Sequence, residues 1–202
     1  MKIFFEKAKG QITKEEKIEA LISAVSINNA PAVQFIFSET NDLYDDKFTV
    51  AFAALQLGRK KIFDEIMKDK DFQNKFSNEN FGKISVKKML SAAVKGGNVD
   101  LIKTVLDKAR DQYKHSWNTS NKTNPEVAAD IFIAHLCAKE LKIAVASDNI
   151  GSVRLLMERT NQAFEHKDIF TPEKIKIWDA QKLDLLSLAI KNNQPNIVLL
   201  NL

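Results

Sequence analysis

The chain has 202 residues, of which 45% are apolar and 28% are charged, and this balance argues against disorder. No apolar run approaches the ~20 residues of a membrane span, and the N-terminus, Met1-Lys2-Ile3-Phe4-Phe5-Glu6, carries charge too soon for a secretory signal. A lone Cys137 rules out an internal disulfide, so we expect a cytoplasmic protein in a reducing compartment.

The first predicted helix begins at a capping box, Thr13-Lys14-Glu15-Glu16, and follows an apolar stripe to Ala24. Asn28-Asn29 and then Pro31 come next, and these residue types end one helix and start another. The same pattern of helix, tight turn and second helix returns along the chain. Its anchoring alanines are Ala24, Ala54, Ala93, Ala144 and Ala189.

An apolar stripe marks the first helix of each copy. One residue of the stripe lies three positions before the anchoring alanine and another directly after it, which places both on one buried helical face. The earlier residues are Leu21, Ala51, Leu90, Leu141 and Leu186. The later residues are Val25, Leu55, Val94, Val145 and Ile190. The second helices align on Val33, Phe63, Ile102, Val153 and Val198.

The turn between the two helices has its own recurring chemistry. Four residues past the anchor stand Asn28, Gly58, Gly97, Asp148 and Asn193, residue types that tolerate a positive φ and so end helices. The next position is an N-cap and holds Asn29, Arg59, Asn98, Asn149 and Gln194. Arg59 and Gln194 depart from the preferred cap residues. The alternative interpretation is five unrelated helical hairpins in one bundle.

Extra helices are predicted in the intervals between copies, because the anchors lie 30, 39, 51 and 45 residues apart. Asn124-Pro125-Glu126 is a helix start that leads into one long helix over residues 125–147. Thr171-Pro172-Glu173 repeats the same signal. The polar stretches 73–83 and 113–123 are predicted to be loops.

Residues 90–106 resemble the core of an ankyrin repeat, with Ala93 in the first helix, Gly97-Asn98 at the turn and Val99-Asp100-Leu101-Ile102-Lys103 opening the second helix. The family's Thr-Pro-Leu-His start is replaced by Lys88-Met89-Leu90-Ser91, and its Gly-Ala-Asp ending is missing. The intervals also depart from the family's usual ~33 residues. These departures predict that the family's β-hairpins are largely lost.

The resemblance implies an all-α fold, an α-solenoid of about five stacked helix-turn-helix repeats with extra helical insertions. We expect one elongated domain over residues 1–202. The repeat cores are predicted at residues 21–37, 51–67, 90–106, 141–157 and 186–202. The last core ends on an uncapped apolar helix, which favours either a fragment of a longer protein or an end that binds something.

Motifs that carry chemistry are sparse. The sequence has neither a dinucleotide-binding glycine motif nor a phosphate-binding loop. His135 and Cys137 lie two residues apart on a predicted helix, so they point in different directions and make a poor metal pair. Cys137 and Trp178 are predicted to be core residues. We therefore expect no enzyme activity, no metal and no cofactor.

In ankyrin-like stacks the first helices line a concave binding face. By position, the resemblance implies that the exposed residues between the anchoring alanine and the turn of each copy belong to that face. Ile27 and Leu57 stand out because they are apolar, the alternative being burial under an N-terminal helix. Trp117 lies in a polar stretch. One interpretation is an exposed anchor for a partner, since Trp is enriched at binding hot spots, and the alternative is that its side chain folds back onto the neighbouring repeat. The candidate partner-binding residues are Ile27, Gln56, Leu57, Lys95, Trp117, Ser147 and Lys191.

The leading functional hypothesis is a protein–protein interaction scaffold. Divergent ankyrin-like proteins of intracellular bacteria act as effectors injected into host cells, so the resemblance also implies a host protein as partner. The first alternative is the non-catalytic interaction region of a larger enzyme or effector. The second is a nucleic-acid or anionic-lipid binder, since residues 59–122 hold 15 Lys or Arg against 8 Asp or Glu. Their bias toward Lys, a poorer reader of phosphate than Arg, disfavours nucleic acid.

Overall fold

The computed structural model describes residues 12–39, 46–77, 79–116, 124–164 and 172–200. Within these ranges the chain forms helices and no strands, so the all-α prediction is confirmed. The helices are α2 (Lys14–Ser26), α3 (Ala30–Glu39), α4 (Lys47–Gln56), α5 (Lys60–Ile66), α6 (Lys70–Ser77), α7 (Glu79–Gly96), α8 (Val99–Ser116), α9 (Pro125–Ala146), α10 (Ile150–Phe164), α11 (Pro172–Lys191) and α12 (Pro195–Val198).

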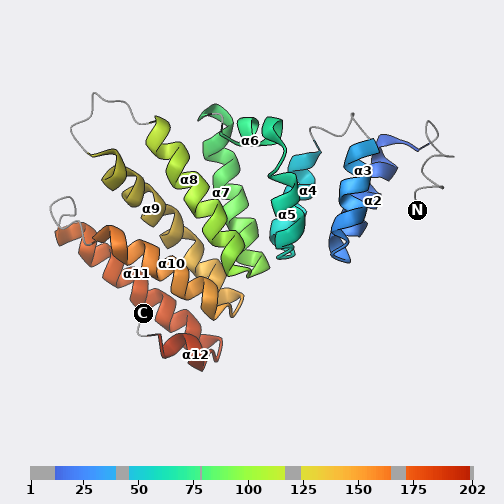
Figure 1. The fold of residues 1–202 in the computed structure, drawn as a ribbon. Coiled ribbons are helices and arrows are strands. Elements are labelled where there is room, and N and C mark those ends of the chain that lie inside the picture. Colours follow the sequence, from blue (N-terminus) through green and yellow to red (C-terminus); the bar gives the residue numbers. More distant parts are fainter. Residues whose placement is uncertain (1–11, 40–45, 78, 117–123, 165–171, 201–202) are drawn as a thin grey trace.

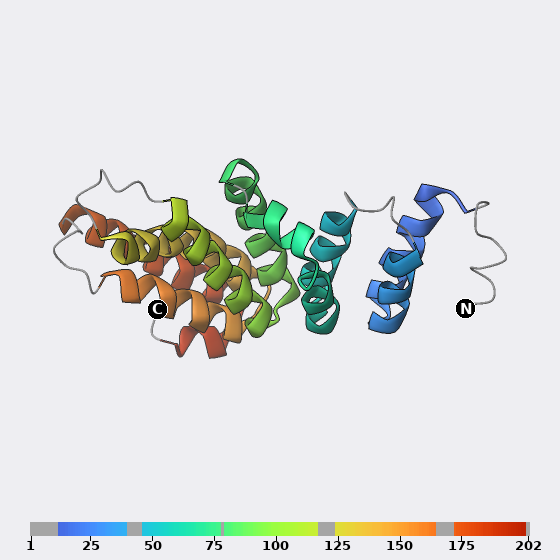
Figure 2. The ribbon, with the colours of Figure 1, turned by 45° about the horizontal axis from the view of Figure 1, so that its top comes forward.

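Consecutive helices pair into hairpins that follow one another in chain order. The pairs are α2–α3, α4–α5, α7–α8, α9–α10 and α11–α12, with α6 inserted before α7. The first helices of successive pairs touch, α2 with α4, α4 with α7, α7 with α9 and α9 with α11. As a result α2–α3 lies at one end of the molecule and α11–α12 at the other (Figure 1), an order that Figure 2 shows from a second direction.

The core runs through the contacts between hairpins. All five anchoring alanines are buried, none with more than 6% of its surface exposed. Small residues permit close approach: a Cβ added to Gly96 at the end of α7 would lie 2.1 Å from the carbonyl oxygen of Leu55 on α4. The stripe residues beside the anchors are buried from Leu21 to Val145, but Ile190 in the last copy is 61% exposed.

The turns adopt the backbone conformation that the sequence predicts. Each of the five aligned residues has a positive φ, at 58° for Asn28, 66° for Gly58, 69° for Gly97, 52° for Asp148 and 55° for Asn193. In the first copy the N–H of Asn28 donates to the Val25 carbonyl, and that of Asn29 donates to the Ala24 carbonyl. This pair of bonds is a Schellman ending, which satisfies carbonyls at the C-terminus of the helix.

The N-cap position joins successive copies, a role that the sequence did not reveal. Asn98 and Asn149 cap α8 and α10 through their side-chain oxygens, as Asn29 caps α3. Their Nδ2 groups also donate to the preceding turn, Asn98 to the Gly58 carbonyl (3.2 Å) and Asn149 to the Gly97 carbonyl (3.0 Å).

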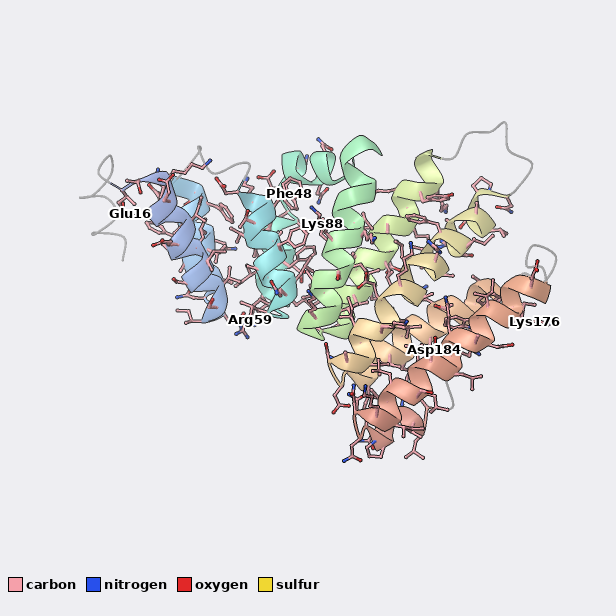
Figure 3. The ribbon with its side chains drawn as sticks, turned by 180° about the vertical axis from the view of Figure 1, so that it is seen from behind. Glu16, Phe48, Arg59, Lys88, Lys176 and Asp184 are labelled. Carbon is pink, nitrogen blue, oxygen red and sulfur yellow. The ribbon has the colours of Figure 1, made fainter. Side chains whose placement is uncertain are left out.

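Arg59 and Gln194 make only this second type of bond. Neither side chain caps its own helix. Instead the guanidinium of Arg59 donates to the Ser26 carbonyl (2.7 Å), and Gln194 donates to the Val145 carbonyl (2.7 Å). Figure 3 shows Arg59 at the turn end of the helices. A ladder of side-chain hydrogen bonds therefore links each turn to the one before it. The longer side chains, Arg59 and Gln194, occupy the two positions at which the side chain does not cap its own helix.

Two helix starts predicted from the sequence are confirmed, while the predicted loops are wrong in part. The capping box of α2 is formed, with the Glu16 N–H donating to Thr13 Oγ1 (3.2 Å). Residues 125–146 form a single helix as expected. Within the stretch 73–83, expected to be a loop, residues 73–77 belong to α6 and residues 79–83 to α7. Phe72 of α6 is buried against Phe48 of α4, ring centroids 4.5 Å apart, so packing outweighs the polar local composition.

The prediction of a second loop is wrong for residues 113–116, because α8 continues to Ser116. Tyr113 stacks on Phe132 of α9 at 4.3 Å between centroids, and Arg110 forms ion pairs with Glu126 and Asp130 of the same helix. These contacts hold the last turns of α8 against α9. Residues 117–123 lie outside the described residues.

Candidate functional site

The candidate residues near the turns are exposed wherever the structure describes them. Ile27 has 74% of its surface exposed and Leu57 has 44%, so the alternative that they are buried is wrong. Trp117 lies outside the described residues. The other candidates are also at the surface: Gln56, Lys95, Ser147 and Lys191. They form a row along the turn ends of successive hairpins, and nothing gathers them into a single cluster.

A denser feature lies on the exposed faces of α7 and α9, and we call it the basic surface. Spacings of seven and eight residues on α7, and of three, four and seven on α9, place its residues on one side of each helix, and α7 packs against α9. Its members are exposed, and no ion pair within the described part of the chain neutralises its lysines. The basic surface consists of Lys87, Lys88 and Lys95 of α7 and His135, Lys139 and Lys142 of α9. Figure 3 labels Lys88.

The charges of the basic surface act on one another across the two helices. The pKa of His135 is lowered by partial burial and by the nearby charges of Lys139 and Lys87. Lys87 belongs to α7 and His135 to α9, and the packing of these two helices brings the two rows side by side. The sequence shows the lysines but not that helices separated by about thirty residues would bring them together, which is why this surface was missed.

A buried carboxyl lies beneath the basic surface. Glu140 is 5% exposed, and its Oε2 has no hydrogen-bond partner among the described residues. Burial raises its pKa, and a hydrogen bond from Ser91 and the charges of Lys87 and Lys95 offset part of that effect. Glu140 therefore contributes one poorly solvated acid beneath a group of five lysines.

A pocket of about 340 Å³ opens between α9, α10 and α11. Trp178 is buried, as predicted, and stacks on Phe164 with 5.7 Å between ring centroids. Its indole N–H donates to Asn161 Oδ1 (3.3 Å). The lining is mostly apolar and consists of Ile131, Ala134, His135, Ala138, Thr160, Phe164, Ile177, Trp178 and Gln181. His135 belongs both to this lining and to the basic surface, so the two features are continuous.

Other chemical groups in the described residues are isolated. Cys137 is buried on α9, as predicted, and burial raises its pKa to about 12, so the thiol stays protonated. Exposed His135 and buried Cys137 point in different directions, again as predicted. No group of three metal-ligating side chains occurs in the part of the chain that the structure describes. None of the helices described there combines the length and apolar character that crossing a bilayer requires.

The exposed side of α2 carries the opposite charge from the basic surface. Three glutamates are exposed on this helix: Glu15, Glu16 and Glu19. Figure 3 labels Glu16 near the end of the molecule that α2 and α3 form. The charge of the exposed surface therefore changes from acidic to basic between the first helices of different hairpins.

Comparison with protein-family models, with curated proteins and with solved structures finds no match to this chain. We therefore infer function from the residues and their geometry.

Proposed function

We propose that the chain is a divergent ankyrin-type solenoid that binds a partner protein through the exposed faces of its first helices. Two observations support the repeat architecture: the positive φ at all five aligned turn positions and the ladder of bonds between neighbouring turns. Stacks of this kind present an extended surface whose binding properties are set by residues outside the repeated core.

The observation that carries the binding proposal is the contrast between the two faces of the first helices. Their buried faces repeat the same alanines and aliphatic residues in each copy. Their exposed faces change from the glutamates of α2 to the lysines of α7 and α9. A face that only had to remain solvated would not need to gather unpaired lysines on adjacent helices, whereas a binding face gains selectivity from charge complementarity.

Site-specific photocrosslinking in cells that express the protein tests this proposal. We expect a photoreactive residue at Lys95 or Ser147, on the first-helix side, to capture a discrete partner. The matched positions Lys103 and Lys108 are exposed on α8, and we expect no capture there. Equal capture from both sides, or none from either, would contradict the proposal.

A second candidate, binding to nucleic acid or anionic lipid, is favoured by the unpaired lysines of the basic surface. Three other lysines of residues 59–122 are already paired: Lys60 with Asp64, Lys68 with Glu65 and Lys114 with Glu126. Binding through the remaining lysines releases counterions, so affinity for single-stranded DNA or anionic vesicles should fall steeply with salt. A flat salt dependence would remove this candidate.

A further inference from the structure

We propose that the basic surface and the adjoining α9–α11 pocket together bind an acidic peptide segment that carries one bulky apolar side chain. The apolar side chain enters the pocket, and carboxylates of the segment pair with lysines of α7 and α9. This inference rests on the proposed function, because it names the partner chemistry for the same first-helix face.

The pocket suits a single anchoring side chain. Its volume of about 340 Å³ is at the low end of the range for small-ligand pockets. Its polar groups are largely satisfied within the protein, since the Thr160 hydroxyl donates to the Leu156 carbonyl (2.8 Å) and Trp178 donates to Asn161. The stacked rings of Phe164 and Trp178 form an aromatic wall. An apolar or aromatic occupant therefore loses less on entry than a polar one.

The charge around the pocket selects for acid. Lys139 lies one helical turn from His135, which lines the pocket, and the charge of Lys87 acts on His135 from α7, which packs against α9. Lys182 lies over the Trp178 ring at 5.5 Å from its centroid, which adds a cation on the α11 side. A peptide anchored in the pocket thus passes lysines on either side of its anchor, and carboxylates next to the anchor residue can reach them.

The same geometry argues against two other anionic ligands. A nucleic-acid strand is read mainly by Arg and by exposed stacking rings, whereas this surface holds only Lys and a histidine, and Trp178 is buried. A fatty acid carries a single carboxylate, which leaves most of the lysines of the basic surface without a partner. Both ligands serve as competing outcomes of the test.

Fluorescence anisotropy with labelled synthetic peptides tests the proposal on the full chain. The first peptide alternates glutamate and serine around one central phenylalanine, the second replaces the phenylalanine by alanine, and the third replaces every glutamate by lysine. We expect the first peptide to bind, the second to bind about tenfold more weakly, and the third not to bind.

Three variants separate the pocket from the charge. Ala138→Trp fills the pocket from a half-buried position in its lining, and Lys139→Glu reverses one charge beside it. Each should weaken binding of the first peptide by about tenfold or more. Lys103→Glu changes the net charge equally on α8, away from the site, and should leave the affinity unchanged. Thermal melting checks that each variant is folded, and Lys139→Glu keeps the test decisive if Ala138→Trp is not.

Several outcomes would overturn the proposal. It fails if the phenylalanine and alanine peptides bind equally, or if Lys103→Glu weakens binding as much as Lys139→Glu. Tighter binding of an oligothymidine strand or of laurate, with the same sensitivity to Ala138→Trp, would assign the site to that ligand class instead. If photocrosslinking at Lys95 and Ser147 captures a partner but the three peptides bind equally, this inference is refuted and the proposed function still stands.

Discussion

At the scale of single residues, the turns are the most demanding positions in the chain. Asn28, Asp148 and Asn193 carry a side chain at φ between 52° and 58°, a region in which most side chains cost about 1–2 kcal/mol per residue. Asn and Asp reduce that cost by local hydrogen bonding, and glycine avoids it at Gly58 and Gly97. Because the constraint is local, the residue type alone reveals the turn.

Asp148 offers a direct test of this constraint. Asp148→Val should lower the free energy of unfolding by about 1–2 kcal/mol, because a β-branched side chain is strained at a φ of 52°. Asp148→Gly should change it by less than about 0.5 kcal/mol, since relief of strain offsets the greater freedom of the unfolded chain. Urea unfolding followed by circular dichroism measures both. Equal losses for the two variants would show that the side chain matters rather than the backbone conformation.

Glu140 predicts a pH dependence. Burial raises its pKa in the folded state, so the folded protein binds this proton more tightly than the unfolded chain does. The contribution of Glu140 to stability is therefore lost as the pH rises from its pKa in the unfolded chain to its higher pKa in the folded protein. Above the higher pKa the loss is complete. Glu140→Gln removes the charge and keeps a partner for Ser91, so we expect a more stable protein at neutral pH.

The same measurement contains its control. Below pH ~4 Glu140 is protonated in both the folded and the unfolded state. The difference in free energy of unfolding between Glu140→Gln and the unchanged protein should therefore disappear. Urea unfolding over a series of pH values measures this convergence. A variant that is less stable at neutral pH would mean that Lys87 and Lys95 stabilise the carboxylate more than burial disfavours it.

At the scale of helices, α4 and α7 approach closely at Gly96. A Cβ there would lie 2.1 Å from a backbone carbonyl, which cannot rotate away, so Gly96→Ala should cost about 3 kcal/mol or more. Gly151 is the comparison, because its added Cβ would meet side-chain atoms rather than backbone, Val99 Cγ2 at 2.7 Å and Asn149 Oδ1 at 3.6 Å. Val99 has to shift, which offsets the gain of alanine within a helix, so Gly151→Ala should cost less than about 1 kcal/mol. Similar melting temperatures for both variants would contradict this account of the contact.

The ladder between turns can be separated from helix capping at Asn149. Asn149→Asp keeps an oxygen to cap the Ser152 N–H but loses the donor to the Gly97 carbonyl, and we expect a loss of about 1 kcal/mol. Asn149→Ala loses both bonds and should cost about 1–2 kcal/mol more. Denaturant unfolding of the two variants distinguishes the contributions. If Asn149→Asp is as stable as the original, the bond between turns contributes nothing.

The sequence predicts features that depend on neighbouring residues and misses those that depend on packing partners. The turn at Gly97 and the capping box at Thr13 follow from local chemistry, and both are present. The α6 helix depends on the contact of Phe72 with Phe48, and local polar composition hides it. The basic surface depends on α7 lying beside α9, and Arg59 looked like a broken cap because its partner belongs to the preceding hairpin.

At the scale of the whole molecule, each hairpin completes the burial of the one before it. The residue directly after the anchor is fully buried in the first four copies, as Val145 shows, while its equivalent Ile190 on α11 is 61% exposed. The side chains are similarly apolar, so their different exposure reflects position in the row. Leu183 on the same helix is 65% exposed as well.

A pair of lysine substitutions tests this dependence on position. Val145→Lys places a charge without a partner between hairpins and should destabilise the protein by about 4 kcal/mol or more. Ile190→Lys makes the same change at the aligned position, where the side chain is already exposed to water, and should stay within about 0.5 kcal/mol of the original. Urea unfolding at low protein concentration compares the two. A large loss from Ile190→Lys would mean that this face of α11 is covered in solution, and a concentration-dependent midpoint would then identify a second copy of the chain as the cover, because association stabilises only the folded state.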